Sequence, residues 1–168
     1  TDNTKEETEK PVITLGSDNY PPYNYLNEDG VPTGIDVELA AEALHCESCR
    51  IAKTLSFLVH DMPILIVTAG DAKIDNAKYR HYFGAKAKML TADEVVELIG
   101  HAVGGVCPFA VKAGVKIYLD ESLKRFQTVF PACGSGNSAI ELTIPELEQY
   151  SSYEAWVDVC KGWQVENA

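Results

Sequence analysis

The sequence predicts an α+β fold built on one mixed β-sheet. The chain of 168 residues is long enough for a single domain with a sizeable hydrophobic core. Strand-like and helix-like segments follow one another without the regular alternation that is typical of parallel βαβ units. Two β-prone segments, 51–59 and 63–69, are separated only by His60-Asp61-Met62, which predicts an antiparallel hairpin.

The other elements follow from hydrophobic spacing and from capping residues. Polar residues 1–10 have no apolar partner and predict a disordered leader. Capping boxes at Thr91 to Glu94 and Thr143 to Glu146 predict helix starts, and Gly84 predicts a helix end. The predicted strands are 12–15, 51–59, 63–69, 86–90, 115–119, 128–131 and 139–143. The predicted helices are 36–44, 73–83, 91–100, a short one capped by Asp120, 143–150, and a C-terminal helix or irregular arm over 153–163.

The composition is that of an ordinary globular protein, with 46% hydrophobic and 23% charged residues. A net charge of −11 argues against a general nucleic-acid binder. Residues 1–35 hold seven acidic residues and two lysines, so the remainder is less acidic and leaves room for a local basic patch. No apolar run reaches about 18 residues and no signal peptide is recognisable, so we expect neither a transmembrane helix nor a membrane partner.

Five cysteines, an odd number, cannot all pair within one chain. A chain of this length needs no disulfide staples, so we expect reduced thiols in a cytoplasmic setting. Cys46 and Cys49 have the spacing of a zinc or redox pair, with His45 and His101 as further conceivable ligands. No second pair has suitable spacing, so two ordinary thiols are favoured, and we expect no metal and no cofactor.

A glycine-rich loop is the strongest candidate for chemistry. Gly104 and Gly105 allow backbone conformations that side chains forbid, and Pro108 fixes φ and removes one donor. The remaining N–H groups of Gly104, Gly105, Val106 and Cys107 could bind a developing oxyanion. On its own the motif is a weak signal, and a tight turn between two elements would be favoured.

Before the helix at 36–44, the sequence Ile13 to Tyr23 and then Gly34 to Ala40 resembles the beginning of extracellular amino-acid-binding proteins that serve transporters. Such receptors need two lobes, and this match covers only about residues 12–44. We therefore do not expect the receptor's binding function. An extracytoplasmic location would follow if this segment derives from an exported receptor.

A second resemblance covers most of the chain, over the ordered motifs 37–44, 51–55, 67–71, 103–109, 118–123 and 139–142. On these motifs the chain resembles the YbaK/ProX family, the stand-alone relatives of the editing domain of bacterial prolyl-tRNA synthetases. The resemblance implies a mixed, barrel-like sheet flanked by helices and hydrolysis of the ester in mischarged aminoacyl-tRNA. The implied partners are the 3′ end of aminoacyl-tRNA and an aminoacyl-tRNA synthetase.

The resemblance also implies roles for particular residues. The loop from Gly104 to Pro108, with Gly105, Val106 and Cys107, would form the oxyanion site and position water or a tRNA hydroxyl. Lys53 matches the family's motif lysine and would hold a phosphate or ribose, or orient the ester carbonyl. The residues predicted to line the amino-acid pocket are Phe109, Ala132, Cys133, Gly134, Asn137, Ser138 and Ala139.

Several alternatives stay open for these side chains. Lys53 could be an outward-facing strand lysine, and Asn137 and Ser138 could simply cap their loop. Cys107 has no obvious histidine or cation beside it, so a pocket wall is favoured over a nucleophile. His101, near the loop, is a minor candidate for a general base.

The predicted organisation is a leader (1–10), a receptor-like segment (11–36) and an editing domain (37–168). The chain thus resembles a join of two families, natural or engineered, in which the strand at 12–15 would replace the family's usual first strand. Ala132 and Ala139 stand where some relatives carry Ser and Asp, which predicts a different or smaller amino acid than cysteine. The alternative function is a non-catalytic binding module, either a remnant receptor or a homologue that holds tRNA.

Overall fold

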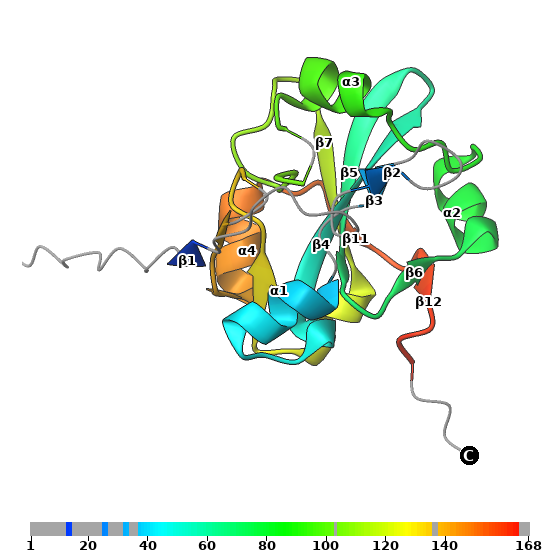
Figure 1. Cartoon of the computed structure of the whole chain (residues 1–168). Coiled ribbons are helices and arrows are strands. Elements are labelled where there is room, and N and C mark those ends of the chain that lie inside the picture. Colours follow the sequence, from blue (N-terminus) through cyan, green and yellow to red (C-terminus); the bar gives the residue numbers. More distant parts are fainter. Residues whose placement is uncertain are drawn as a thin grey trace, which may run out of the picture.

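The computed structural model describes residues 13–14, 25–26, 32–33, 37–102, 104–135 and 138–164. The predicted leader and most of the receptor-like segment lie outside these residues. The main sheet has six strands in the order β10-β8-β4-β5-β7-β11 (Figure 1). Their bounds are β4 Ile51–Val59, β5 Met62–Ala69, β7 Lys116–Asp120, β8 Thr128–Pro131, β10 Leu142–Thr143 and β11 Ala155–Val157.

The sheet is mixed, as predicted. β4 and β5 form an antiparallel hairpin, whereas β4 with β8, β5 with β7, and β7 with β11 run parallel. His60 and Asp61 make the hairpin turn with φ of 48° and 64°, the left-handed conformation that matches the twist of paired strands. β5 lies at the centre of the sheet, and Leu65, Ile66 and Val67 on it are wholly buried. The predicted α+β class and half-barrel sheet with flanking helices are confirmed.

Helices flank this sheet (Figure 1). They are α1 Val37–Leu44, a 3-10 turn η1 Ser48–Arg50, α2 Asn76–Phe83, α3 Ala92–Glu94 continued by a π-helix η2 Val95–Ile99, a 3-10 helix η3 Glu121–Arg125, and α4 Ile144–Ser151. Both predicted capping boxes are present, at Thr91 with Glu94 and at Thr143 with Glu146. In Figure 1, α2 lies to the right of the central strands, whereas α4 and the segment that follows η2 lie to the left.

Three short strand pairs lie outside the main sheet. β1 Ile13–Thr14 pairs with β9 Ser138–Ala139, β2 Tyr25–Leu26 with β3 Pro32–Thr33, and β6 Lys73–Ile74 with β12 Cys160–Lys161. The predicted strand at 12–15 is therefore confirmed at Ile13 and Thr14, and it contacts one of the predicted pocket strands.

Four predicted elements need correction. The helix predicted at 73–83 begins at Asn76, because Asp75 caps it and Lys73–Ile74 pairs with β12 instead. Residues 86–90 make only an isolated bridge between Met89 and Phe57. The strand predicted at 139–143 is divided into β9 and β10, which pair with different partners. Residues 153–163 form β11 and β12 and no helix, because each finds a strand partner far away in the sequence.

Within the described residues, no helix combines the length and apolar character needed to cross a membrane.

Candidate functional site

Gly104 and Gly105 are required for two different reasons. Gly104 has φ of 88°, a backbone conformation that side chains rarely adopt. At Gly105 the reason is space, because a Cβ there would lie 2.7 Å from the carbonyl carbon and oxygen of Gly134 and from the Cα of Ser135. The predicted oxyanion loop, 104–108, therefore touches the predicted amino-acid loop, 132–139, backbone against backbone.

The backbone donors of the first loop are not all available. The Gly105 N–H donates to the Ala102 carbonyl at 3.0 Å, and the Cys107 N–H donates to His101 Nδ1 at 3.4 Å. Pro108 has no N–H. Among the described residues, the N–H groups of Gly104 and Val106 have no partner, and neither residue is fully buried. These two amides, which have no partner among the described residues, are the candidate donors for a substrate oxygen.

Cys107 has a histidine beside it, contrary to the sequence analysis. Its Sγ lies 3.9 Å from His101 Nδ1 and 3.7 Å from the Phe109 carbonyl oxygen. Burial raises the pKa of the Cys107 thiol, and hydrogen bonds with the backbone of Phe109 and Gly134 offset part of this rise. A neutral thiol that is only 2% exposed is a poor nucleophile, so these contacts support a role in the pocket wall. Because His101 Nδ1 accepts from the Cys107 amide, a general base there would act through Nε2.

The second loop is held closed by its own hydrogen bonds. Ala132 bridges to Ala139, and the Cys133 N–H donates to the Ser138 carbonyl at 3.1 Å. The Ser138 hydroxyl lies 2.7 Å from the Ser135 hydroxyl and 3.2 Å from the Cys133 carbonyl. Ser138 therefore has the loop-capping contacts that the sequence left as an alternative. Asn137 lies outside the described residues.

Lys53 lies on β4 and pairs with Thr68 of β5. Its Nζ donates to the Gly70 carbonyl at 3.1 Å, and burial lowers the pKa of its ammonium. Gly70 itself tolerates no side chain, since a Cβ there would lie 2.0 Å from the Ser48 carbonyl oxygen. The motif 67–71, which carried part of the resemblance, thus supplies the carbonyl that holds the Lys53 ammonium. Gly70 was not among the site residues predicted from the sequence.

Lys53 and the glycine loop lie on different elements. Because side chains alternate along a strand, Lys53 shares a face of β4 with Phe57, whose ring packs 5.1 Å from Tyr79 of α2. Among the described residues, no hydrogen bond or ion pair joins Lys53 to the loop 104–108. The two are linked through β8, since Ala52 pairs with Pro131, directly before Ala132.

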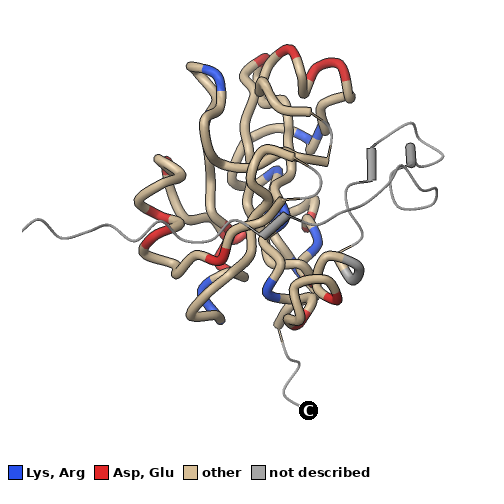
Figure 2. The backbone as a smooth tube through the Cα atoms, turned by 60° about the vertical axis from the view of Figure 1, so that its left-hand side comes forward, with Lys and Arg blue, Asp and Glu red and all other residues tan. Residues whose placement is uncertain are grey.

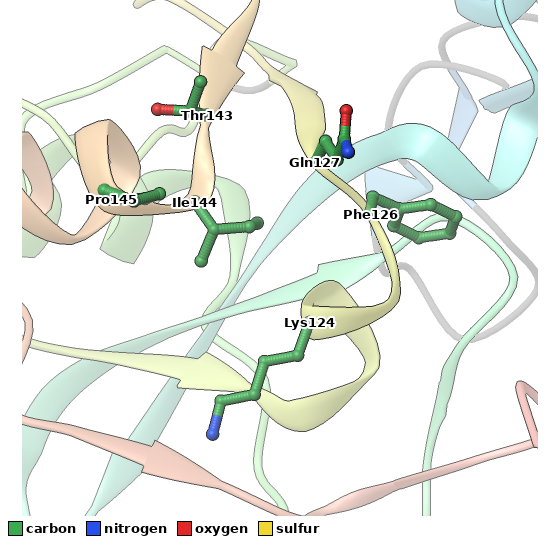
Figure 3. A pocket seen from close by; sticks show the side chains of 6 residues that line it. All are labelled: Lys124, Phe126, Gln127, Thr143, Ile144 and Pro145. Atoms are coloured by element: carbon green, nitrogen blue, oxygen red, sulfur yellow. The ribbon is translucent and has the colours of Figure 1, made fainter.

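Two further features of the described residues are a pair of thiols and a surface hollow. Cys46 and Cys49 are partly exposed free thiols whose pKa burial raises, and the described residues contain no metal-binding group of three His, Cys, Asp or Glu side chains. A surface hollow shown in Figure 3 contains none of the predicted site residues, and the ammonium of its lysine is bound to Glu121. The hollow is lined by Lys124, Phe126, Gln127, Thr143, Ile144 and Pro145.

Fold and site together define a class of protein, a half-barrel α+β domain whose candidate centre is made of two touching loops. The chain belongs to the aminoacyl-tRNA editing domain family, whose model matches residues 31–150. This confirms the second resemblance. The match begins ahead of the boundary predicted at residue 37. The join with a receptor-like segment stays a prediction, because that segment lies mostly outside the described residues.

Relatives and solved structures agree with this assignment. The uncharacterized protein YwhH of Bacillus subtilis (strain 168) is 60% identical over 129 residues, which are 76% of this chain and 82% of YwhH. A proline–tRNA ligase of Lactobacillus johnsonii is 34% identical over 98 residues, which are 57% of this chain but 17% of the ligase. A solved structure described as a candidate trans-editing enzyme for prolyl tRNA synthetase has a TM-score of 0.73 at 25% identity, covering 91% of this chain and 87% of its own.

Proposed function

We propose that the protein hydrolyses the ester bond of mischarged aminoacyl-tRNA. The observation that carries this proposal is the contact of Gly105 with Gly134, which joins the predicted oxyanion loop to the predicted amino-acid loop. Membership of the editing-domain family supports the substrate class, and the similarity to part of a proline–tRNA ligase supports a link to synthetases.

The reaction follows from the chemistry of esters. The oxygen of a water molecule, positioned by the loop or by a tRNA hydroxyl, attacks the ester carbonyl carbon, and the carbonyl electron pair moves onto its oxygen. The N–H groups of Gly104 and Val106 donate to this oxyanion more strongly than to the neutral carbonyl, which lowers the barrier. Collapse breaks the bond to the ribose oxygen, which takes up the proton lost by the attacking group. Lys53 holds a phosphate near the 3′ end and so limits where the ester can lie.

The test is ester loss from tRNAs charged with alanine, serine, cysteine or proline. We expect faster loss than in buffer for at least one of them, and the small residues Ala132 and Ala139 favour a small amino acid. No acceleration for any of the four would overturn the proposal. Binding of tRNA without acceleration would instead support the non-catalytic module, and a thermal shift with free amino acids would support a remnant receptor.

A further inference from the structure

Two lysines face each other in the strand pair formed by β6 and β12. In the antiparallel pair of β6 and β12, Lys73 lies directly opposite Lys161. Residues placed in this way project from the same face, with Cβ atoms about 4.5–5.5 Å apart, and like charges there are destabilising. Both lysines are exposed, and neither forms an ion pair with any described residue. The fold therefore projects two ammonium groups from one face of this strand pair. After the hydrogen bond from the Lys78 amide, the nearby charge of Lys161 also helps to lower the pKa of the Asp75 carboxyl, although the two side chains form no ion pair.

The acidic residues nearby are already occupied. Asp71 is bound by both terminal nitrogens of Arg125, at 2.6 and 2.9 Å. Asp158 is bound by Lys78 at 2.8 Å. Asp75 accepts the backbone N–H groups of Ala77 and Lys78 as the cap of α2.

This lysine pair is close to Lys53. Lys73 is among the charges that lower the pKa of Lys53, after burial as the main cause. Cys160, which precedes Lys161, also lies near Lys53 and is wholly buried. Lys53 and Lys73 thus lie near each other, together with Asp71, whose charge raises the pKa of Lys53, and Lys161 faces Lys73. By contrast, residues 92–97 carry three acidic residues and no basic one, and red segments mark this stretch at the top of Figure 2.

We propose that Lys73 and Lys161 bind a phosphate of the tRNA strand that leads to the aminoacylated 3′ end. This inference rests on the proposed function for the identity of the nucleic acid. A phosphodiester between the two ammonium groups removes their repulsion, and Lys53 takes the neighbouring phosphate closer to the ester. In a chain with a net charge of −11, a local cationic cluster determines the side from which a polyanion approaches.

The experiment measures binding of fluorescently labelled, uncharged tRNA at several salt concentrations. Lys73→Gln and Lys161→Gln should each weaken binding, and the double variant should bind roughly tenfold or more weakly. The slope of log K against log salt should become shallower by about 0.7–0.9 for each lost lysine–phosphate contact. Replacing both lysines by arginine keeps the charges and should keep the slope.

Lys88→Gln is the matched control, since Lys88 is also an exposed lysine. Its carbonyl accepts from Leu58, five residues along β4 from Lys53 and so about 17 Å away. This control should leave affinity and slope unchanged. If the double glutamine variant binds like the wild type, or if the wild type does not bind tRNA, the inference is wrong.

Kinetics and stability separate this inference from the proposed function. If the protein deacylates tRNA, the double glutamine variant should raise KM and keep kcat. If the double glutamine variant deacylates tRNA with an unchanged KM, the lysine pair does not bind the tRNA, and the proposed function is unaffected. Binding that depends on the two lysines, without deacylation, would support this inference and contradict the proposed function.

Lys73→Glu should raise or preserve Tm, because opposite charges then face each other, while tRNA binding falls; a parallel loss of Tm would indicate a structural role instead.

Discussion

The contact between Gly105 and Gly134 and the contact between Lys73 and Lys161 both join residues that are far apart in the sequence, yet they are built differently. At the glycines, two backbones touch because neither residue has a side chain, and the groups without a partner among the described residues are the neutral amides of Gly104 and Val106. At the lysines, two charged side chains project from paired strands without a described partner. Neutral, fixed amides suit the stabilisation of charge that develops during a reaction, whereas exposed ammonium groups suit binding to charge that is already present.

The largest effect is expected for a substitution at Gly105. Gly105→Ala places a Cβ 2.7 Å from the Gly134 backbone, so the two loops must move apart. We expect kcat for deacylation to fall by about 100-fold, because this movement displaces the Gly104 and Val106 amides and the loss of one oxyanion donor has an effect of this size. Affinity for uncharged tRNA should change little, because the lysine pair is intact.

Gly114→Ala is the control for this variant. Gly114 also lies between η2 and β7 and has φ of 91°, but a Cβ there meets no atom within 4 Å. It should therefore lower stability while leaving kcat largely unchanged. If Gly105→Ala and Gly114→Ala have the same kcat, the loop contact has no catalytic importance.

Lys53 tests the connection between the two regions. Lys53→Ala should reduce kcat/KM by roughly tenfold, as expected for one hydrogen bond from a charged group. Circular dichroism should show that the variant keeps its fold. An unchanged kcat/KM would show that Lys53 is not part of the site.

The same lysine predicts a pH dependence of stability. Burial lowers the pKa of Lys53 below 10.5, so between the folded pKa and 10.5 the unfolded chain binds more protons than the folded one. The free energy of unfolding that Lys53 contributes therefore rises with pH across this window and is lost as pH falls through the folded pKa. Relative to Lys53→Ala, the wild type should gain Tm as pH rises toward 10.5, and a constant difference would contradict the buried ammonium.

The smallest effect is expected at Cys107. Cys107→Ala removes a buried neutral thiol but leaves the backbone amides in place, so kcat should change by less than about threefold. A covalent nucleophile would instead lose nearly all of the rate on this substitution. Single-turnover deacylation distinguishes the two, and a near-complete loss with an unchanged fold would make Cys107 the nucleophile beside His101.

The sequence by itself determined the features that depend on neighbouring residues. The capping boxes at Thr91 and Thr143, the β4–β5 hairpin and the helix stop at Gly84 are as predicted, because a cap or a turn is specified within about four positions. The family resemblance also marked Lys53 and the glycine loop as candidates before any geometry was known.

Only the tertiary structure decided which distant groups meet. It placed Gly134 against Gly105, His101 against Cys107, and Lys161 opposite Lys73. It also turned 153–163 into strands, because strand pairing depends on a partner elsewhere in the chain and local patterns do not contain that information. A one-residue shift in the register of β12 would have put Lys161 on the other face of its strand. Lys53 and the loop residues were therefore predictable from the sequence, whereas the pairing of Lys73 with Lys161 depended on the fold.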